Sequence, residues 1–245
     1  MLQPIILVAG KGTRMQTAEP KTLFPLKGKP MINWLLDMLA EVEGAKSPLI
    51  VIGHNGDMIR ERVGDAYTYV TQTELTGPAS GVAVCAPIFS TQSDPVVILY
   101  GDNPFVAADT IRAAENIFNT EKATLVFGVV EVPHFADEYA AFYKFSRILR
   151  KADGTLDRLV EYKYTTEEQR QLREVSPGVF CIDPVWLAGA LPRVVPAGEG
   201  GEYYLTDLIR IALEDGVTIA TVPLAPREGV GINSIEDAAC AQFFL

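Results

Sequence analysis

The stretch Leu7-Val8-Ala9-Gly10-Lys11-Gly12-Thr13-Arg14-Met15, followed by Pro20-Lys21, carries the most information in this sequence. A short apolar run enters a glycine-rich turn, and glycine lets backbone N–H groups approach an anion closely. Arg14 and Lys21 add two positive charges beside that turn. The Walker and dinucleotide-binding glycine patterns are both absent. A bare Gly-x-Gly is also typical of an ordinary tight turn, but the full string predicts a phosphate-binding loop.

On both sides of this loop, short apolar runs alternate with helical patterns, which is typical of βαβ units around a largely parallel sheet. The expected strands are rich in β-branched residues and almost continuously apolar, as in strands covered on both faces. They span residues 5–9, 49–53, 67–71, 96–100, 125–130, 175–182 and 218–223. The expected helices span residues 31–43, 57–63, 79–86, 108–119 and 203–214. We therefore predict an α/β fold with a mixed sheet.

The pattern changes between residues 140 and 176. Polar alternation over 142–146, followed by Asp153-Gly154, predicts an antiparallel hairpin, and a charged stretch over 167–173 follows it. No linker rich in Ser, Gly or Pro separates this segment from the rest. We therefore predict one domain over residues 1–245, with a lobe over about 131–182.

Composition limits the classes of partner. The chain has 245 residues, is 48% hydrophobic and carries a net charge of −10, so it is a poor general ligand for nucleic acid or for an anionic membrane. The N-terminal apolar run is too short for a signal peptide, and no apolar stretch approaches the ~18 residues of a membrane span. We expect a cytoplasmic protein with small-molecule substrates. The sequence is also compatible with a homo-oligomer.

Cysteine and histidine usage argues against two kinds of site. Cys85, Cys181 and Cys240 form no CxxC pair, and we expect buried thiols in a reducing compartment. His54 and His134 are the only histidines, which excludes a His-rich zinc site.

Two oxygen-bearing side chains follow apolar or glycine-rich segments. Asp102 comes directly after an expected strand, and α/β sheets bind ligands at the carboxyl ends of their strands. Asn233 stands in a glycine-rich turn before a C-terminal helix. The alternative role of each residue is to cap the element that follows it. Together they offer two hard oxygen ligands, which suits Mg²⁺ because this ion completes its octahedron with phosphate and water.

Five motifs occur in the order found in one family. They are Gly10 to Lys21, Leu99-Tyr100-Gly101-Asp102, Val160-Glu161-Tyr162-Lys163, Gly201-Glu202-Tyr203-Tyr204-Leu205-Thr206-Asp207 and Gly231-Ile232-Asn233. The chain thereby resembles the sugar-1-phosphate nucleotidylyltransferases (NDP-sugar pyrophosphorylases), above all the uridylyltransferase domain of the bacterial bifunctional enzyme that makes UDP-N-acetylglucosamine. The resemblance implies a Rossmann-like, mostly parallel mixed sheet with helices on both faces and a small antiparallel sugar-binding lobe.

The implied reaction transfers a nucleotidyl group from a nucleoside triphosphate, here UTP, to a sugar 1-phosphate and releases pyrophosphate. The resemblance assigns the phosphates to the catalytic residues Arg14 and Lys21, and Mg²⁺ to Asp102 and Asn233. Nucleotide-binding residues would be Ala9, Gly10, Gly12, Thr13, Gln72, Thr76, Gly77 and Tyr100, and sugar-binding residues Glu161, Ser176 and Thr206. Taken alone, Gln72 is equally typical of an ordinary surface glutamine, and Tyr100 of a core tyrosine.

Departures from the family pattern lie mostly on the sugar side. The segment 75–79 is shortened, Tyr139-Ala140-Ala141-Phe142 stands for Tyr-Gly-Arg, and Ser176-Pro177-Gly178 stands for Asn-Thr-Gly. Asn103 follows Asp102 where an aliphatic residue is usual. We expect a sugar 1-phosphate without an N-acetyl group to be used at least as well as the N-acetylated one, unless residues 139–147 rebuild the lost contacts. Because the chain ends at Leu245, we expect no acetyl-transferring activity.

Two other functions remain open at this point. One is cytidylyl or thymidylyl transfer to another phosphorylated acceptor, against which Gln72 and the 202–207 string argue. The other is a catalytically silent, ligand-sensing relative. The presence of Arg14, Lys21, Asp102 and Asn233 favours an active enzyme.

Overall fold

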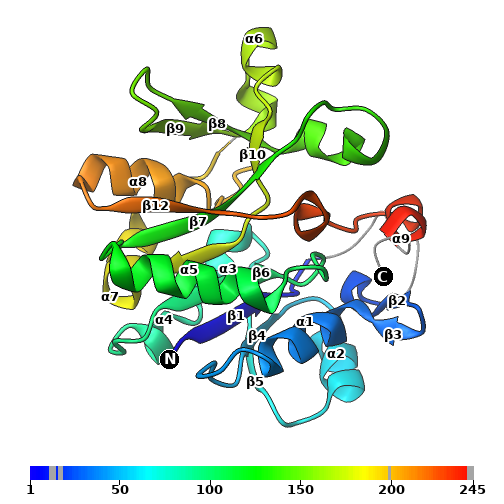
Figure 1. The fold of residues 1–245 in the computed structure, drawn as a ribbon. Coiled ribbons are helices and arrows are strands. Elements are labelled where there is room, and N and C mark those ends of the chain that lie inside the picture. Colours follow the sequence, from blue (N-terminus) through cyan, green and yellow to red (C-terminus); the bar gives the residue numbers. More distant parts are fainter. Residues whose placement is uncertain (11–14, 16–18, 198–199, 242–245) are drawn as a thin grey trace.

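The computed structural model describes residues 1–10, 15, 19–197 and 200–241 (Figure 1). In this part of the chain one ten-stranded mixed sheet has the order β5-β4-β1-β6-β11-β7-β10-β8-β9, with β12 beside β7. Its central strands run parallel to one another, except for β11 (Phe180–Ile182), which is antiparallel to β6 and β7. The parallel set is β1 (Gln3–Leu7), β4 (Leu49–Ile52), β5 (Thr68–Thr71), β6 (Val96–Tyr100), β7 (Leu125–Glu131) and β12 (Ile219–Pro223).

Helices cover both faces of the central strands, as expected (Figure 1). Neighbouring strand residues point to opposite faces. Ile6 packs in the core cluster that includes α1 (Met31–Ala40) and α5 (Ala108–Thr120). Ile5 packs in the opposite cluster, which holds the buried residues of α3 (Pro78–Ala83), α7 (Pro184–Ala190) and α8 (Asp207–Asp215).

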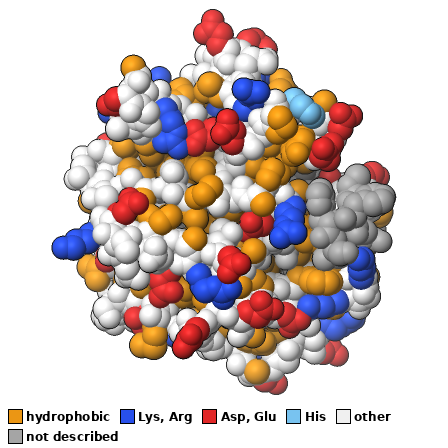
Figure 2. Space-filling view, viewed as in Figure 1, with side chains coloured by type: hydrophobic (Ala, Val, Ile, Leu, Met, Phe, Trp, Pro, Cys, Tyr) orange, Lys and Arg blue, Asp and Glu red, His pale blue; other side chains and the backbone are white. Residues whose placement is uncertain are grey.

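Shorter elements complete the core. They are β2 (Pro25–Leu26), β3 (Lys29–Pro30), α2 (Gly56–Val63), α4 (Ala86–Phe89), α9 (Ile235–Ala241), and the 3-10 helices η2 (Lys21–Leu23), η5 (Leu191–Arg193) and η6 (Pro226–Gly229). Within the described residues, no helix has the length and apolar character needed to cross a bilayer. Acidic and basic side chains are interspersed over the face seen in Figure 2.

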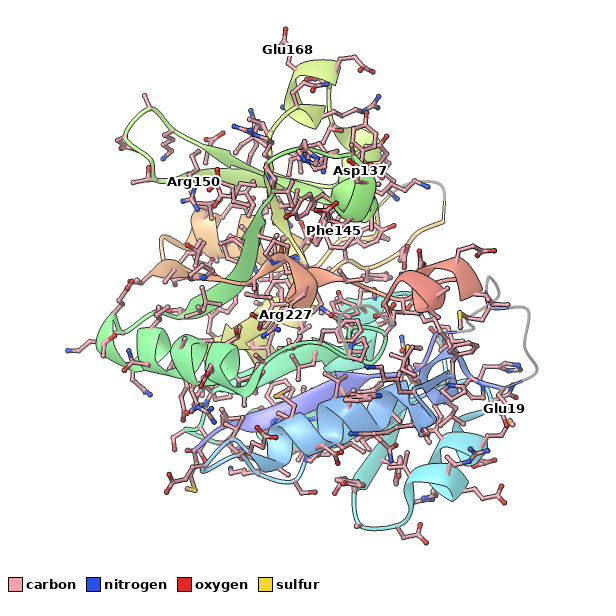
Figure 3. All side chains as sticks on the ribbon, turned by 45° about the vertical axis from the view of Figure 1, so that its right-hand side comes forward. Glu19, Asp137, Phe145, Arg150, Glu168 and Arg227 are labelled. Atoms are coloured by element: carbon pink, nitrogen blue, oxygen red, sulfur yellow. The ribbon has the colours of Figure 1, made fainter. Side chains whose placement is uncertain are left out.

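The predicted lobe extends the sheet beyond β7. The expected hairpin is formed by β8 (Ser146–Arg150) and β9 (Leu156–Val160), and β10 (Glu174–Ser176) joins β8 to β7. Figure 3 shows Arg150 and Glu168 at the outer end of the lobe, while Phe145 lies where the lobe meets the core. The 3-10 helices η3 (Asp137–Lys144) and η4 (Tyr162–Tyr164) and the short helix α6 (Glu167–Arg170) fill the connections.

Several expected element boundaries are wrong. Residues 142–145 are not part of the hairpin, because η3 runs to Lys144 and the strand begins at Ser146. The expected strand over 175–182 is two strands, β10 in the lobe and β11 in the central sheet. Pro177 lacks an N–H for the ladder and Gly178 has a φ of +88°, so the chain leaves the extended conformation between them. The lobe therefore ends before β11 and does not reach residue 182. The bounds of the expected helix over 79–86 are also wrong, because the chain forms two helices there, α3 and α4.

Two of the three cysteines behave as predicted. Cys85 and Cys181 are free and buried among apolar side chains. Burial raises the pKa of the Cys85 thiol to about 12, and it also raises the pKa of Cys181. These thiols are therefore protonated packing groups near neutral pH.

A buried arginine organises the inner part of the lobe. Arg147 is fully buried, and its guanidinium donates to the backbone carbonyl oxygens of Tyr143, Phe145 and Arg170. The same group lies 4.6 Å from the ring centroid of Phe135. Burial lowers the pKa of Arg147 from its ordinary value, but an arginine so far above neutrality stays charged. Arg147 thus ties η3 and α6 to the first residues of β8.

We predict that Arg147→Met lowers the free energy of unfolding by about 2–4 kcal/mol, because three partly buried carbonyl groups lose their donor. Urea unfolding measures the change. Arg158→Met on β9 is the matched control, since Arg158 is exposed and pairs only with its neighbour Asp157 among the described residues. An equal loss in both variants would contradict a role of Arg147 in holding the lobe together.

Candidate active site

A cavity of about 690 Å³ opens at the carboxyl ends of β1, β5 and β6. Its walls come from the segments that follow these strands, from the lobe and from residues 202–206 and 229–233. Predicted site residues that line it are Ala9, Gly10, Lys21, Gln72, Gly77, Tyr100, Asp102, Glu161, Ser176, Thr206 and Asn233. Thr76 does not line the cavity, and Gly12, Thr13 and Arg14 lie outside the described residues.

The predicted phosphate and metal residues meet at one point. The Lys21 Nζ donates to Asp102 Oδ2 at 2.5 Å and to Asn233 Oδ1 at 2.9 Å. The Lys21 and Asp102 side chains are 16% and 21% exposed, so the ion pair is largely shielded from water. The backbone N–H of Ile232 also donates to the Asp102 carbonyl oxygen at 2.8 Å, which fixes the 231–233 turn against the end of β6.

Close packing after β6 brings Asp102 to this point. Gly101 donates its N–H to the Leu7 carbonyl oxygen at 2.9 Å, which continues the β1–β6 pairing past the strand end. A Cβ on Gly101 would lie 2.4 Å from Val8 Cγ1 and 2.9 Å from Thr22 Cγ2. Only glycine lets the Asp102 turn approach the start of the predicted phosphate loop this closely.

Asn233 is not the cap of the C-terminal helix. Ser234 Oγ accepts from the Asp237 N–H, and Asp237 Oδ2 accepts from the N–H groups of Asn233 and Ser234. Ser234 and Asp237 therefore cap α9 between them, and the Asn233 side chain oxygen is directed to Lys21. The capping alternative for Asn233 is wrong.

The donor set around Lys21 suits a cation. Its ammonium group already lies between a carboxylate oxygen and an amide oxygen, the two kinds of hard ligand that Mg²⁺ prefers. Within the described residues, no three His, Cys, Asp or Glu side chains gather into a metal-binding group. A site with two protein oxygens leaves the other positions of an octahedral ion to phosphate and water, so these residues fit Mg²⁺.

Gln72 lies in a buried position, so it is not an ordinary surface glutamine. Its side chain is 6% exposed, and its Nε2 donates to the Gly77 carbonyl oxygen at 3.0 Å and to Ser80 Oγ at 2.8 Å. A third bond from Nε2 reaches the Glu74 carbonyl oxygen. Gln72 thus holds the loop between β5 and α3 in shape while it lines the cavity.

That loop is paired with the 202–206 segment. The Tyr203 N–H donates to the Thr76 carbonyl oxygen at 2.7 Å, and the Ala79 N–H donates to the Tyr203 carbonyl oxygen at 3.0 Å. Gly77 has a φ of +126°, and a Cβ there would lie 2.6 Å from the Tyr203 oxygen. These bonds keep Tyr203 out of a helix. The helix expected over 203–214 is therefore present as α8, but its expected start is wrong, because α8 begins at Asp207.

Glu161 and Thr206 meet on the lobe side. Thr206 Oγ1 donates to Glu161 Oε1 at 2.5 Å across the cavity wall. Tyr100 lies against Gly178, where an added Cβ would be 2.5 Å from the ring. Burial raises the pKa of Tyr100, and the charges of Glu161, Asp102 and Glu202 raise it further, so the phenol stays protonated.

Some lining residues were not assigned to the site individually, although several lie in segments that the sequence had singled out. Thr22, Lys144, Ser146, Glu202 and Tyr204 also line the cavity. None of residues 139–142, where the sugar-side departure was expected, does so, because they belong to η3. Ser146 is the first residue of β8, and the apolar pair Ile148-Leu149 is the sequence signal for this strand. The strand brings Ser146 to the cavity.

Comparison with known proteins agrees with this architecture. A family model described as a MobA-like NTP transferase domain matches residues 4–171. The chain belongs to this family. The match confirms the nucleotidyltransferase class predicted from the sequence.

Relatives of this NTP transferase domain cover its whole length. "Bifunctional protein GlmU" of Heliobacterium modesticaldum is 35% identical over 242 residues, which are 98% of this chain and 51% of that protein. GlmU of Brevibacillus brevis is 31% identical over 245 residues, 100% of this chain and 51% of that protein. The chain thus spans about half the length of these relatives.

A solved structure confirms the predicted fold. The crystal structure of a UDP-glucose pyrophosphorylase complexed with UDP-glucose superposes with a TM-score of 0.77 and covers 99% of this chain and 97% of its own. Because the sequence identity is 16%, this likeness concerns the fold alone.

We predict that Gly77→Ala lowers the free energy of unfolding by at least ~2 kcal/mol, because a Cβ would meet backbone atoms at a strained φ. Gly154→Ala is the control, since Gly154 has a φ of +83° with nothing within 4 Å of its added Cβ. Thermal and urea unfolding of both variants measure the difference. Equal losses would mean that φ alone matters and that the 77–203 contact contributes nothing.

Proposed function

We propose that this protein transfers a uridylyl group from UTP to a sugar 1-phosphate in a Mg²⁺-dependent reaction, releasing pyrophosphate and a UDP-sugar. The observation that carries the proposal is the Lys21 ammonium held between Asp102 and Asn233, on the wall of the cavity that Ala9 and Gly10 also line. Positive charge and cation-binding oxygens lie together where a triphosphate has most need of neutralisation. The homologous relatives and the NTP transferase family support the same class of reaction.

Both substrates bring their own reacting groups. The sugar phosphate supplies the nucleophilic oxygen and the triphosphate supplies the leaving group, so the protein has to position them and neutralise charge. Lys21 lines the cavity, and we assign its ammonium group to the transferred phosphate of the nucleotide or to the phosphate of the acceptor sugar. Arg14, outside the described residues, is assigned to the β- and γ-phosphates.

Asp102 and Asn233 would hold Mg²⁺, which supplies charge neutralisation and orientation at the phosphate oxygens. In the structure Lys21 occupies those two oxygens, so the side chain has to leave them when a divalent cation binds. Release from Asp102 frees the ammonium for a phosphate. Asp102 and Asn233 would therefore hold Lys21 in place without substrate and release it toward a phosphate when metal and nucleotide bind.

Base and sugar would bind at opposite ends of the cavity. Gln72, Gly77 and the 9–10 segment lie on the core side, which we assign to the nucleotide. The Glu161–Thr206 pair and Ser176 lie toward the lobe, which we assign to the sugar. Tyr100, between Asp102 and Gly178, would pack at the junction of the two.

A pyrophosphate-release panel tests the function. Four nucleoside triphosphates are each combined with several sugar 1-phosphates and Mg²⁺, and we expect the highest kcat/KM with UTP. Preference for CTP or dTTP would replace the uridylyl assignment by another nucleotide. No pyrophosphate release with any pair would favour the silent, ligand-sensing alternative.

Asp102→Asn tests the metal assignment, because the amide keeps the shape of the side chain and loses its charge. We expect turnover to fall by at least about 100-fold, a far larger effect than the loss of stability from breaking the ion pair with Lys21. Asp157→Asn, at a half-buried aspartate on β9 that does not line the cavity, is the control and should retain activity. Undiminished wild-type turnover in excess chelator would contradict Mg²⁺ dependence.

Removing Lys21 separates its two proposed roles. Lys21→Met should lower kcat and kcat/KM together, because the ammonium acts on charge in the transition state. The same variant should bind Mn²⁺ about tenfold more tightly without nucleotide, since no ammonium competes for Asp102 and Asn233. Titration followed by electron paramagnetic resonance measures free Mn²⁺ directly.

Lys144→Met is the control for Lys21→Met, because it removes a positive charge from the lobe side of the same cavity. Equal tightening in both variants would mean that general charge, rather than the direct contact, weakens metal binding. A raised KM with an unchanged kcat in Lys21→Met would show that the residue serves binding alone.

A further inference from the structure

Glu228 is a buried carboxylate that does not line the cavity. Its side chain is 5% exposed, and it belongs to η6, the segment that carries Arg227 in Figure 3. Glu228 Oε2 accepts from the Ala107 N–H at 2.9 Å and from the Thr110 hydroxyl at 2.5 Å. Its Oε1 accepts from the Ala225 N–H at 3.2 Å. One carboxylate therefore bonds to two segments that are far apart in the chain.

The first of these segments is the start of α5. Ala107 precedes the first residue of this helix and has no side-chain oxygen that could act as a cap. Glu228 supplies the acceptor from 121 positions further along the chain, and its negative charge suits the positive end of the helix dipole. A carboxylate has two acceptor oxygens and no donor, so it can serve α5 and its own segment at the same time.

The two segments that Glu228 joins are those that carry the proposed metal ligands. Asp102 begins the stretch that ends at Ala107, and Asn233 follows Glu228 by five residues. The Ile232 N–H donates to the Asp102 carbonyl oxygen at 2.8 Å, next to the ligands themselves. The bond from Ala107 to Glu228 joins the same segments at their other ends. The two segments are therefore bound to each other at both ends.

Such contacts are needed because local structure does not place Asn233. Residues 230–233 belong to no helix or strand of the described chain. Lys21 also joins Asp102 to Asn233, but under the proposed function it leaves both oxygens when a divalent cation binds. The Lys21 contact therefore cannot hold the two ligands in the metal-bound state. The Glu228 carboxylate uses neither of those oxygens and can keep its bonds in that state.

We propose that Glu228 is a positioning residue of the metal site, which fixes Asp102 and Asn233 relative to each other and thereby sets the affinity for a divalent cation. This rests on the proposed uridylyltransferase function. Mg²⁺ demands a nearly ideal octahedral geometry, so displacement of one ligand weakens its binding. Replacing a residue that orients metal ligands from outside typically lowers affinity or activity by about 10- to 100-fold.

Titration with Mn²⁺, followed by electron paramagnetic resonance without nucleotide, tests the proposal in the absence of turnover. Glu228→Gln keeps the shape of the side chain but leaves one acceptor oxygen for donors on two sides. The substitution is made in the Lys21→Met chain, in which no ammonium holds the two ligands together. We expect the Kd for Mn²⁺ to rise about tenfold.

Thr110→Val in the same background is a milder variant, which keeps the proposal testable if Glu228→Gln does not fold. It removes one of the three bonds to the carboxylate and leaves the charge in place. We expect it to raise the Kd for Mn²⁺ about threefold. Circular dichroism establishes that each variant is folded at the temperature of the titration.

Asp183→Asn is the matched control, because it makes the same change from carboxylate to amide at the start of another helix. Asp183 Oδ1 accepts from the Trp186 N–H at 2.7 Å at the start of α7, and Asp183 does not line the cavity. This variant should lose stability and keep its affinity for Mn²⁺.

Turnover gives a second measurement. In the otherwise unchanged chain, Glu228→Gln should raise the Mg²⁺ concentration for half-maximal pyrophosphate release about tenfold, and excess Mg²⁺ should restore most of kcat. The KM for the sugar 1-phosphate should stay within about twofold. An equal loss of turnover at every Mg²⁺ concentration would make Glu228 a structural residue only and overturn the proposal.

The possible failures are distinct. Unchanged Mn²⁺ affinity in both Glu228→Gln and Thr110→Val, or an equal weakening in Asp183→Asn, overturns the positioning role and leaves nucleotidyl transfer standing. A wild type that neither binds Mn²⁺ nor releases pyrophosphate with any pair of substrates overturns the proposed function, and the positioning role falls with it.

Discussion

The ion pair between Lys21 and Asp102, completed by the amide oxygen of Asn233, is the contact on which the site depends. Asp102 lies 81 positions after Lys21 in the chain, and Asn233 lies 212 positions after it. A largely shielded carboxylate needs a partner, because an unpaired charge in such a place is costly. The three segments that carry Lys21, Asp102 and Asn233 must therefore meet. The β1–β6 pairing, extended by the Gly101 N–H, brings together the segments that follow these two strands.

The cavity has a chemical end and a recognition end. The chemical end lies at the carboxyl edge of the parallel core strands, where Asp102 follows β6 and pairs with Lys21 of η2. The recognition end lies on the lobe. Direct contacts join the two parts: Thr206 donates to Glu161, and Lys163 donates to the Tyr204 hydroxyl at 2.8 Å, which itself donates to Glu202 at 2.6 Å. The proposed function assigns the sugar to the lobe and the phosphates to the core, and this division would let the lobe change its sugar contacts while the core frame is kept.

The sequence predicted elements best where local pattern and final packing agree. The strand over 96–100 is continuously apolar and became β6 with the same bounds, because both of its faces are buried. Prediction failed where a distant segment overrides local preference. Residues 203–206 read as the start of a helix, but both backbone groups of Tyr203 pair with Thr76 and Ala79 instead, and α8 begins at Asp207. Pro177 and Gly178 likewise divide one apolar run between two parts of the sheet.

The sequence by itself determined the α/β class, the glycine-rich loop and the residue types of the site, because these follow from local periodicity and short motifs. Only the tertiary structure decided that Lys21 reaches both Asp102 and Asn233, that Ser234 rather than Asn233 caps α9, and that Ser146 stands opposite Ser176. Those facts depend on strand register and on loops meeting across the sheet. A one-residue shift in register turns a side chain to the other face, and no local pattern specifies which residue of a distant strand will lie opposite.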